Sequence, residues 1–172
     1  MPAPLTVSTP NDTDVVVVRT FDAPRELVWR AWSEPEHLKA WWAPRPYRTV
    51  ECEMDLRPGG TFYTRMVGPE DFDSPVRGCF LEVVPGEKAV WTTALTAGYR
   101  PTAEPPHGCG AFVFTAIMTF EDAGEGRTRY RAIVLHRDQA DRDTHAEMGF
   151  YDGWGTCATQ LGEVAAGLRG KA

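Results

Sequence analysis

Apolar and polar residues alternate along much of this chain, and the alternation predicts a sheet. Residues 13–21 contain a continuous β-branched run, and residues 49–56 alternate strictly between apolar and polar side chains. A period of two is typical of strands that bury one face and expose the other. The same criterion predicts further strands at residues 61–67, 76–84, 88–95, 111–121 and 127–136. Because short links join the last six of these seven strands, an antiparallel meander is favoured over a parallel sheet.

Helical patterns occur after the first strand and at the end of the chain. A short helix is predicted to begin near Pro24, where the missing N–H of proline costs nothing. A second short helix is predicted from Pro35, and Pro44 ends it. Residues 138–168 contain no proline and carry apolar side chains at every third or fourth position, so we expect one long helix there.

These elements together predict an α+β fold in one domain spanning residues 1–172. A chain of 172 residues can bury a substantial core, and 42% hydrophobic with 24% charged residues is typical of globular proteins. Residues 1–12 are polar and lack the basic and apolar parts of a signal peptide, so we expect a flexible leader.

The charge pattern disfavours two classes of partner. The formal net charge is −6, whereas nucleic-acid binding needs clustered lysine and arginine. No apolar run approaches the roughly 20 residues that span a bilayer, so stable membrane insertion is not expected. The four histidines show no H-E-x-x-H or comparable spacing, so neither a metal nor another cofactor is expected.

Four cysteines, Cys52, Cys79, Cys109 and Cys157, are dispersed along the chain without a C-x-x-C pair. This spacing supports neither a zinc site nor a disulfide framework in a chain of this length. We therefore expect four reduced thiols and a cytoplasmic location.

Six short motifs, followed by Leu161 and Leu168, resemble the START-like (Bet v helix-grip, SRPBCC) superfamily. Within it, the chain is similar to the activator of heat-shock protein 90 ATPase homologue-like family. The motifs are RTFDAP at 19–24, VWRAW at 28–32, WWAP at 41–44, DLRPGG at 55–60, the segment 78–85 and GFYDGW at 149–154. They extend over residues 15–168 in the order typical of the family.

The resemblance implies a helix-grip fold: a seven-stranded curved antiparallel sheet, two short helices and a long C-terminal helix around an apolar cavity. Members of the superfamily bind lipids, sterols, polyketides and plant hormones, and some cyclise polyketides. The family itself takes its name from a domain of a co-chaperone. A fold of this kind implies a cavity more firmly than it implies a reaction.

The leading hypothesis is that the protein binds a small apolar or amphipathic molecule between the sheet and the C-terminal helix. Such sites are mostly apolar, with a few polar groups that fix the ligand's orientation. We expect the inward faces of the strands and one face of the helix to line this site. The candidate residues are Val50, Cys52, Met54, Phe62, Glu82, Phe112, Phe114, Met118, Tyr130, Tyr151 and Trp154.

Two other functions are left open. An enzyme of the polyketide cyclase or aromatase type would use Glu82, Tyr130 or His145 as a general acid or base, since a carboxyl in an apolar cavity has a raised pKa. A protein-interaction module would instead have a filled core and an exposed apolar patch. Association into a homodimer is also an open alternative.

Four glycines interrupt the predicted C-terminal helix: Gly149, Gly153, Gly155 and Gly162. Each costs roughly 1 kcal/mol relative to alanine inside a helix. This cost indicates close backbone approach, a kink or volume removed above a cavity. The alternative is that the helix begins only near Gly153.

The tryptophans of the two short helices, Trp29 among them, are expected to pack in the core and not to line the ligand site.

Overall fold

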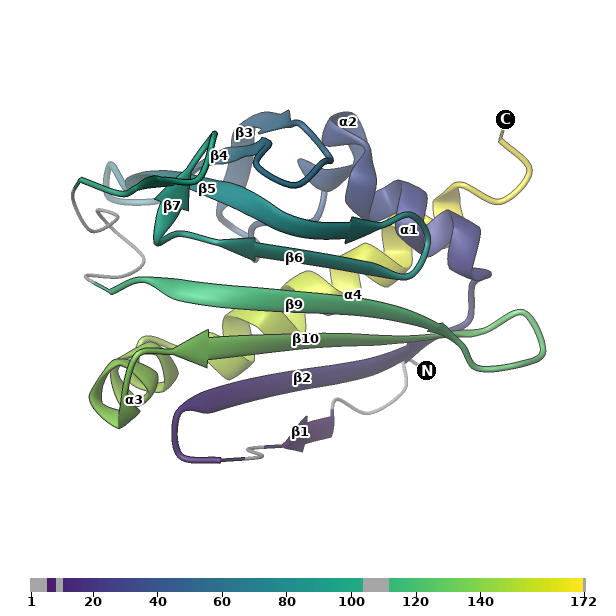
Figure 1. Ribbon diagram of the computed structural model, residues 1–172. Coiled ribbons are helices and arrows are strands. Elements are labelled where there is room, and N and C mark those ends of the chain that lie inside the picture. Colours follow the sequence, from purple (N-terminus) through teal and green to yellow (C-terminus); the bar gives the residue numbers. More distant parts are fainter. Residues whose placement is uncertain (1–5, 9–10, 104–111, 172) are drawn as a thin grey trace.

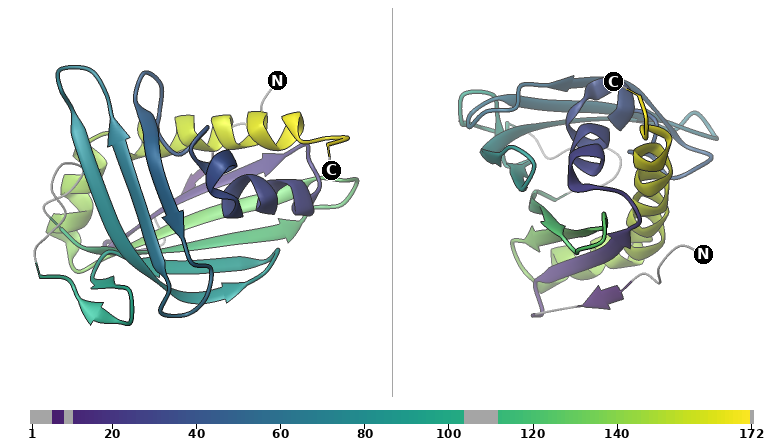
Figure 2. Two further views of the ribbon diagram at one scale, coloured as in Figure 1. Left: turned by 90° about the horizontal axis from the view of Figure 1, so that it is seen from above. Right: turned by 90° about the vertical axis from the view of Figure 1, so that its right-hand side faces the viewer.

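The computed structural model, which describes residues 6–8, 11–103 and 112–171, has a curved antiparallel sheet packed against a C-terminal helix (Figure 1). The helix-grip fold predicted from the sequence is therefore present. Figure 2 shows the sheet curving around this helix, with the two short helices near one end. Cys109 and the second half of the predicted loop at 98–110 lie outside the described residues.

All seven predicted strands are present, and every neighbouring pair is antiparallel. They are β2 (Asp14–Phe21), β3 (Arg48–Met54), β4 (Thr61–Val67), β5 (Asp73–Val84), β6 (Lys88–Thr92), β9 (Phe114–Asp122) and β10 (Thr128–His136). A short strand β1 (Thr6–Ser8) extends the sheet to the order β1-β2-β10-β9-β6-β5-β4-β3. The strands β7 (Leu95–Thr96) and β8 (Arg100–Pro101) form a separate hairpin. Segments of two or three residues are too short for a period-two pattern to reveal them.

The two short helices match the predicted positions, but the predicted long helix is broken into two. The helices are α1 (Arg25–Ser33), α2 (Pro35–Leu38), α3 (Gln139–Glu147) and α4 (Phe150–Gly167). The prediction of one continuous helix over 138–168 is thus wrong at Gly149, whose φ of 88° lies in the left-handed region. Residues with a side chain rarely adopt this conformation, so glycine ends α3 and lets α4 start in a new direction.

Two β-bulges interrupt the side-chain alternation that the sequence pattern suggests. In β3 the register shifts between Thr49 and Glu51, and in β5 it shifts between Phe80 and Glu82. A bulge inserts one residue, so strict alternation cannot hold on both sides of it. In β5 the side chains beyond the bulge are reversed, and Val83 packs against the core instead of Glu82, whereas Cys52 and Met54 beyond the β3 bulge keep the predicted direction. Val50, the inserted residue of β3, is consequently 38% exposed instead of facing inward.

Trp32 of α1 is the centre of the most densely aromatic part of the core. Its side chain is fully buried. The ring centroids of four other aromatic residues lie 5.9 to 6.3 Å from that of Trp32: Trp29, Phe62, Phe80 and Phe120. We call these five residues the Trp32 cluster. Aromatic pairs at such separations contribute beyond the area they bury. The cluster therefore fastens α1 to β4, β5 and β9.

The glycines of α4 have different neighbours. A Cβ atom added to Gly162 would lie 2.8 Å from the ring of Phe21, so this glycine permits close packing of α4 on β2. A Cβ added to Gly153 would meet only Pro44, whose Cγ lies 4.0 Å away. The Gly155 carbonyl accepts a hydrogen bond from the buried Arg19 side chain at 3.4 Å.

Alanine substitutions at Gly149, Gly153 and Gly162 should change the free energy of unfolding in different directions. Gly149→Ala should destabilise the protein by about 1–2 kcal/mol, because alanine is strained at positive φ. Gly162→Ala should cost roughly 1–3 kcal/mol through overpacking against Phe21. Gly153→Ala should instead stabilise by up to about 1 kcal/mol, because it gains helix propensity in open space. Urea unfolding of the three variants measures these changes, and a destabilised Gly153→Ala would contradict the assignment of open space there.

Candidate functional site: an apolar cavity beside the C-terminal helix

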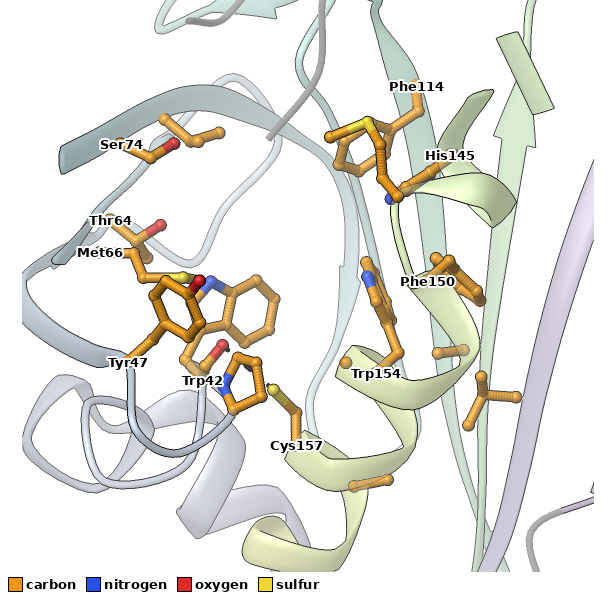
Figure 3. A pocket seen from close by; sticks show the side chains of 18 of the residues that line it. Trp42, Tyr47, Thr64, Met66, Ser74, Phe114, His145, Phe150, Trp154 and Cys157 are labelled. Carbon is orange, nitrogen blue, oxygen red and sulfur yellow. Dashed lines mark hydrogen bonds between the residues drawn. The ribbon is translucent and has the colours of Figure 1, made fainter. Parts of the chain in front are cut away.

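A cavity of about 330 Å³ lies between the sheet and the first half of α4. Its wall is contributed by β2, β4, β5, β6, β9, β10, α3, α4 and the segment that follows α2. Figure 3 shows Tyr47, Thr64 and Met66 on one side of the cavity and Phe114, His145 and Trp154 on the other. The aromatic side chains of the wall are Trp41, Trp42, Tyr47, Phe72, Trp91, Phe112, Phe114, Tyr130, Phe150 and Trp154.

Four of the residues predicted from the sequence line this cavity: Phe112, Phe114, Tyr130 and Trp154. Phe114 and Tyr130 are there because β9 and β10 keep strict alternation through the register that pairs them. Trp154 lies on the face of α4 that meets the sheet, and its ring centroid is 6.4 Å from that of Trp42 across the cavity. Inward parity on regular strands was thus sufficient to locate these positions.

Five other predicted residues face inward or lie against the core but outside the cavity wall. Phe62 and Met118 are fully or almost fully buried in the core, and Phe62 belongs to the Trp32 cluster. Cys52, Met54 and Tyr151 are partly buried and pack against the core from its edge. The inward direction of the four strand residues was predicted correctly, but the Trp32 cluster fills the part of the sheet where a cavity had been expected.

Val50 and Glu82 are the two predicted residues that face the wrong way. Both positions lie at the β-bulges, where alternation fails. The Glu82 carboxylate is half-exposed and forms an ion pair with Lys88 at 2.9 Å, instead of pointing into the cavity. Val83, next in sequence, is the residue that packs against the core.

Several lining residues were missed although the sequence contained a signal for some of them. Thr64 and Met66 share the parity of Phe62 on β4 and line the cavity farther along the strand. Phe150 lies four residues before Trp154 and is buried, with stacked rings 4.9 Å apart. It was missed because a helix continuous through Gly149 places Tyr151 on the inward face.

His145 is the most polar side chain deep in the wall, and it is only 7% exposed. Its Nδ1 atom lies 2.8 Å from Nε2 of His136, and Nδ1 of His136 lies 2.9 Å from the Thr13 carbonyl oxygen. A carbonyl oxygen can only accept, so His136 donates through Nδ1. In the neutral ring Nε2 of His136 must then accept, and His145 donates from its own Nδ1.

Burial keeps both imidazoles neutral. It lowers the pKa of His145 to about 3, with a further lowering from the neighbouring His136. Burial also lowers the pKa of His136, against a smaller raising effect of its hydrogen bond to Thr13. The rings of Phe112, Phe114 and Phe150 lie 4.8 to 5.5 Å from the His145 ring and exclude water from it.

Gln160 of α4 holds the segment that forms one side of the cavity. Its side chain is 2% exposed. Its Nε2 donates to the carbonyls of Trp41 and Ala43 at 3.1 and 2.8 Å, and its Oε1 accepts from the Arg45 amide at 3.2 Å. These three hydrogen bonds fix the orientation of the amide and fasten residues 41–45, including the wall residue Trp42, to α4.

The remaining polar groups near the cavity are neutral or already bonded. The Cys157 thiol donates to the Trp42 carbonyl at 3.4 Å, and burial raises the pKa of this thiol to about 12. Burial likewise raises the pKa of the Tyr130 phenol above its ordinary range. The indole N–H of Trp91 is buried without a hydrogen-bond partner among the described residues.

Metal sites and membrane-spanning helices are absent from the described part of the chain. Within residues 6–8, 11–103 and 112–171, no three His, Cys, Asp or Glu side chains come close enough to hold a metal ion. No helix among the same residues is long and apolar enough to cross a membrane.

Comparison with known proteins identifies the family. Residues 22–166 match the family described as "Activator of Hsp90 ATPase homolog 1-like protein". The chain belongs to this family. Among curated proteins, no sequence matches significantly.

Solved structures of bacterial proteins share the fold of this Hsp90 ATPase activator homologue-like chain. Protein NE0264 from Nitrosomonas europaea is 42% identical, with a TM-score of 0.83 over 91% of this chain and 96% of its own. A Rhodobacter sphaeroides protein is 20% identical, with a TM-score of 0.80 over 96% and 100%. The AHSA1 protein from Silicibacter pomeroyi is 21% identical, with a TM-score of 0.63 over 89% and 97%. The two more distant structures support the fold alone.

Burial of His145 predicts a pH-dependent stability in this family member. With a folded pKa of about 3 against an ordinary value near 6.5, the unfolded chain takes up the proton first as the pH falls. This contribution to stability is complete above pH 6.5 and declines by about 2 kcal/mol between pH 6.5 and 5. Urea unfolding at both pH values should show that the free energy of unfolding decreases less for His145→Phe than for wild type as the pH falls. The control His37→Gln, on the surface helix α2, should behave as wild type, and equal losses in all three proteins would contradict the assignment.

Loss of the Gln160 amide should destabilise the fold. Gln160→Ala leaves two buried carbonyls and one amide without their partners, so we expect a cost of about 2–3 kcal/mol. Thr156→Ala, an exposed substitution one turn earlier on α4, should change stability by less than about 0.5 kcal/mol. Thermal and urea unfolding would compare the two, and similar effects would show that Gln160 does not fasten the segment.

The cysteines should be reduced and slow to react. Cys52, Cys79 and Cys157 are unpaired, and burial raises the pKa of the Cys52 thiol to about 11. Because the thiolate is the nucleophile, iodoacetamide at pH 8 should label Cys52 and Cys157 at least tenfold more slowly in the native protein than in denaturant. Peptide mass spectrometry measures each rate, and denatured, non-reduced protein should contain four free thiols. Two or fewer would indicate a disulfide.

Proposed function

We propose that the protein binds one small apolar or amphipathic molecule in the cavity beside α4, in the cytoplasm. The observation that carries this proposal is the cavity itself, a space of about 330 Å³ whose described wall consists mainly of aromatic and aliphatic side chains. A volume near 300 Å³ is at the lower end of the range for small-molecule sites. An engineered cavity of about 150 Å³ already accepts benzene, so this one has room for about two rings.

The wall combines rigid aromatic surfaces with few polar groups, as ligand sites do. Trp42 and Trp154 form opposing surfaces, while Tyr47 and Thr64 add hydroxyl groups on the β4 side (Figure 3). Burying an apolar molecule of this size against such surfaces is favourable in proportion to the area removed from water. Orientation would then depend on the few polar groups of the wall.

We propose that the cavity opens beside the break between α3 and α4. Met148 lines the cavity and is 50% exposed, and Gly149 follows it in the wall. A flexible, unbranched methionine at an opening can adapt to different ligand shapes. We propose this opening as the route by which the ligand enters.

The two other functions that the sequence left open have less support. Glu82 lies outside the cavity in an ion pair with Lys88, so the acid–base hypothesis loses its carboxyl group. The interaction-module hypothesis needs an exposed apolar patch, yet the large exposed hydrophobic residues of the described chain are Val50, Tyr99 and Met148 on separate elements. An open cavity with scattered surface apolar residues favours ligand binding over both.

Titration with an environment-sensitive apolar dye tests the proposal. We expect saturable binding, displacement by aromatic or long-chain competitors, and at least tenfold weaker binding to Trp154→Ala. Trp29→Ala is the matched control, because Trp29 is also partly buried but lies in the Trp32 cluster. Gly153→Ala should weaken binding while raising stability, since its methyl group takes up cavity volume. Absence of saturable binding, or equal effects at Trp154 and Trp29, would refute this location for the site.

A further inference from the structure

The described part of the cavity wall carries no formal charge. Among its described residues there is no Lys, Arg, Asp or Glu, and its one ionisable imidazole, His145, is neutral. An ion moved from water into such surroundings loses its hydration without gaining a partner. The charge of the wall therefore favours an uncharged ligand, whichever apolar framework that ligand has.

Arg19 is a buried cation on β2, and it is not among the residues that line the cavity. It lies outside the cavity wall, with Nη1 donating to Thr159 Oγ1 at 3.0 Å and Nη2 donating to the Gly155 carbonyl. Two of its nitrogens are thus held by α4, whereas Nε is buried without a hydrogen-bond partner among the described residues. No cation among the described residues of the wall would pair with a carboxylate in the cavity.

The chain of hydrogen bonds from Thr13 through His136 to His145 determines which polar atom His145 offers to the cavity. Because Nδ1 of His145 donates to His136, the proton of the neutral ring is on Nδ1, and Nε2 carries a lone pair. No hydrogen bond at His145 Nε2 occurs within the described residues. Figure 3 shows the His145 ring at the cavity, beside Phe114 and Phe150.

An acceptor in such a place selects for a donor. Phe112, Phe114, Phe150 and Trp154 surround His145 with ring centroids 4.8 to 6.4 Å away. In these apolar surroundings an unpaired acceptor is costly, and a ligand without a donor would leave it unpaired. A hydroxyl group on an aromatic ring would pair with Nε2 while its ring packs on the four side chains.

We infer that the ligand is a neutral aromatic molecule of about two rings that carries a hydroxyl group, and that this hydroxyl donates its hydrogen bond to His145 Nε2. This inference rests on the proposed function and specifies the chemical class of its ligand. It excludes fatty acids and other carboxylates, which an apolar cavity of the same size would otherwise accommodate.

The preference should hold over the neutral pH range. The charged groups that influence the histidine pair are Asp14 of β2 and Asp141 and Arg142 of α3, which act on His136 with opposing signs. The faces contributed by α4, β9 and β10 place aromatic rings and His136 against His145. Protonation of His145 is therefore not expected between pH 6 and 8, where the lone pair of Nε2 persists.

Three probes with one framework test the inference: 2-naphthol, 2-methoxynaphthalene and 2-naphthoate at pH 7. They present a donor, an acceptor without a donor, and an anion. Calorimetric titration of wild type should show naphthoate binding at least tenfold more weakly than naphthol. Naphthoate binding as tight as naphthol would overturn the inference and indicate a cationic partner.

The variant His145→Phe isolates the hydrogen bond, since it keeps an aromatic ring at the position. The ratio of the dissociation constant of methoxynaphthalene to that of naphthol should fall about five- to tenfold from wild type to the variant. Comparing ratios cancels the difference in hydrophobicity between the two probes. An unchanged ratio would overturn the inference while leaving the proposed function intact, and failure of all three probes to bind wild type would contradict both.

A measurement on wild type covers the case in which His145→Phe fails to fold. Nitrogen NMR shifts of the imidazoles report which nitrogen is protonated. We expect His145 to be neutral with its proton on Nδ1 between pH 6 and 8, and its Nε2 resonance to shift on adding naphthol but much less on adding methoxynaphthalene. A proton on Nε2, or equal shifts with both probes, would overturn the inference.

Discussion

The packing of Trp32 between α1 and the sheet is the constraint on which the rest of this structure depends. A curved sheet and a helix laid along it enclose more space than the helix alone can fill. Trp32 and the rings of Phe62, Phe80 and Phe120 fill the part beside the second half of α4. Beside the first half, where α4 carries Gly153 and Ala158, the large aromatic side chains surround a space instead of filling it, and the cavity remains. Filled and hollow parts of one core thus follow from where the large aromatic residues lie.

Much of this arrangement could be predicted from the sequence, because most strands keep strict alternation. Regular pairing of β9 with β10 placed Phe114 and Tyr130 in the cavity as expected. The errors at Val50 and Glu82 arise from bulges, which insert a residue without leaving a distinct sequence signal. The break at Gly149 was similarly hidden, since a glycine within a helical pattern can be an interior residue or a left-handed end. Which inward residues line the cavity depends on side-chain volume. Phe62 faces inward but lies in the filled part of the core, and the alternation of apolar and polar residues does not distinguish the filled part from the hollow one.

Family membership and the geometry of the cavity contribute different information. Membership in the Hsp90 ATPase activator homologue-like family accounts for the helix-grip fold and for the bacterial structures that share it. It does not specify a ligand. The proposed ligand class rests instead on the chemistry of the wall, where the hydrogen bonds from Thr13 through His136 orient His145 and burial keeps it neutral. Gln160 acts on the opposite side, where it holds Trp42 in the wall. The two contacts fix both sides of a site that is otherwise formed by apolar packing.

The division of the core into a filled and a hollow part can be measured directly through the tryptophans, of which the chain has six. Each indole N–H gives one NMR signal, and a bound aromatic ring shifts the signals of the indoles it contacts. Titration with 2-naphthol should shift Trp41, Trp42, Trp91 and Trp154, which line the cavity, and leave Trp29 and Trp32 in place. Shifts centred on Trp29 and Trp32, or no saturable shift at the four cavity tryptophans, would contradict the account.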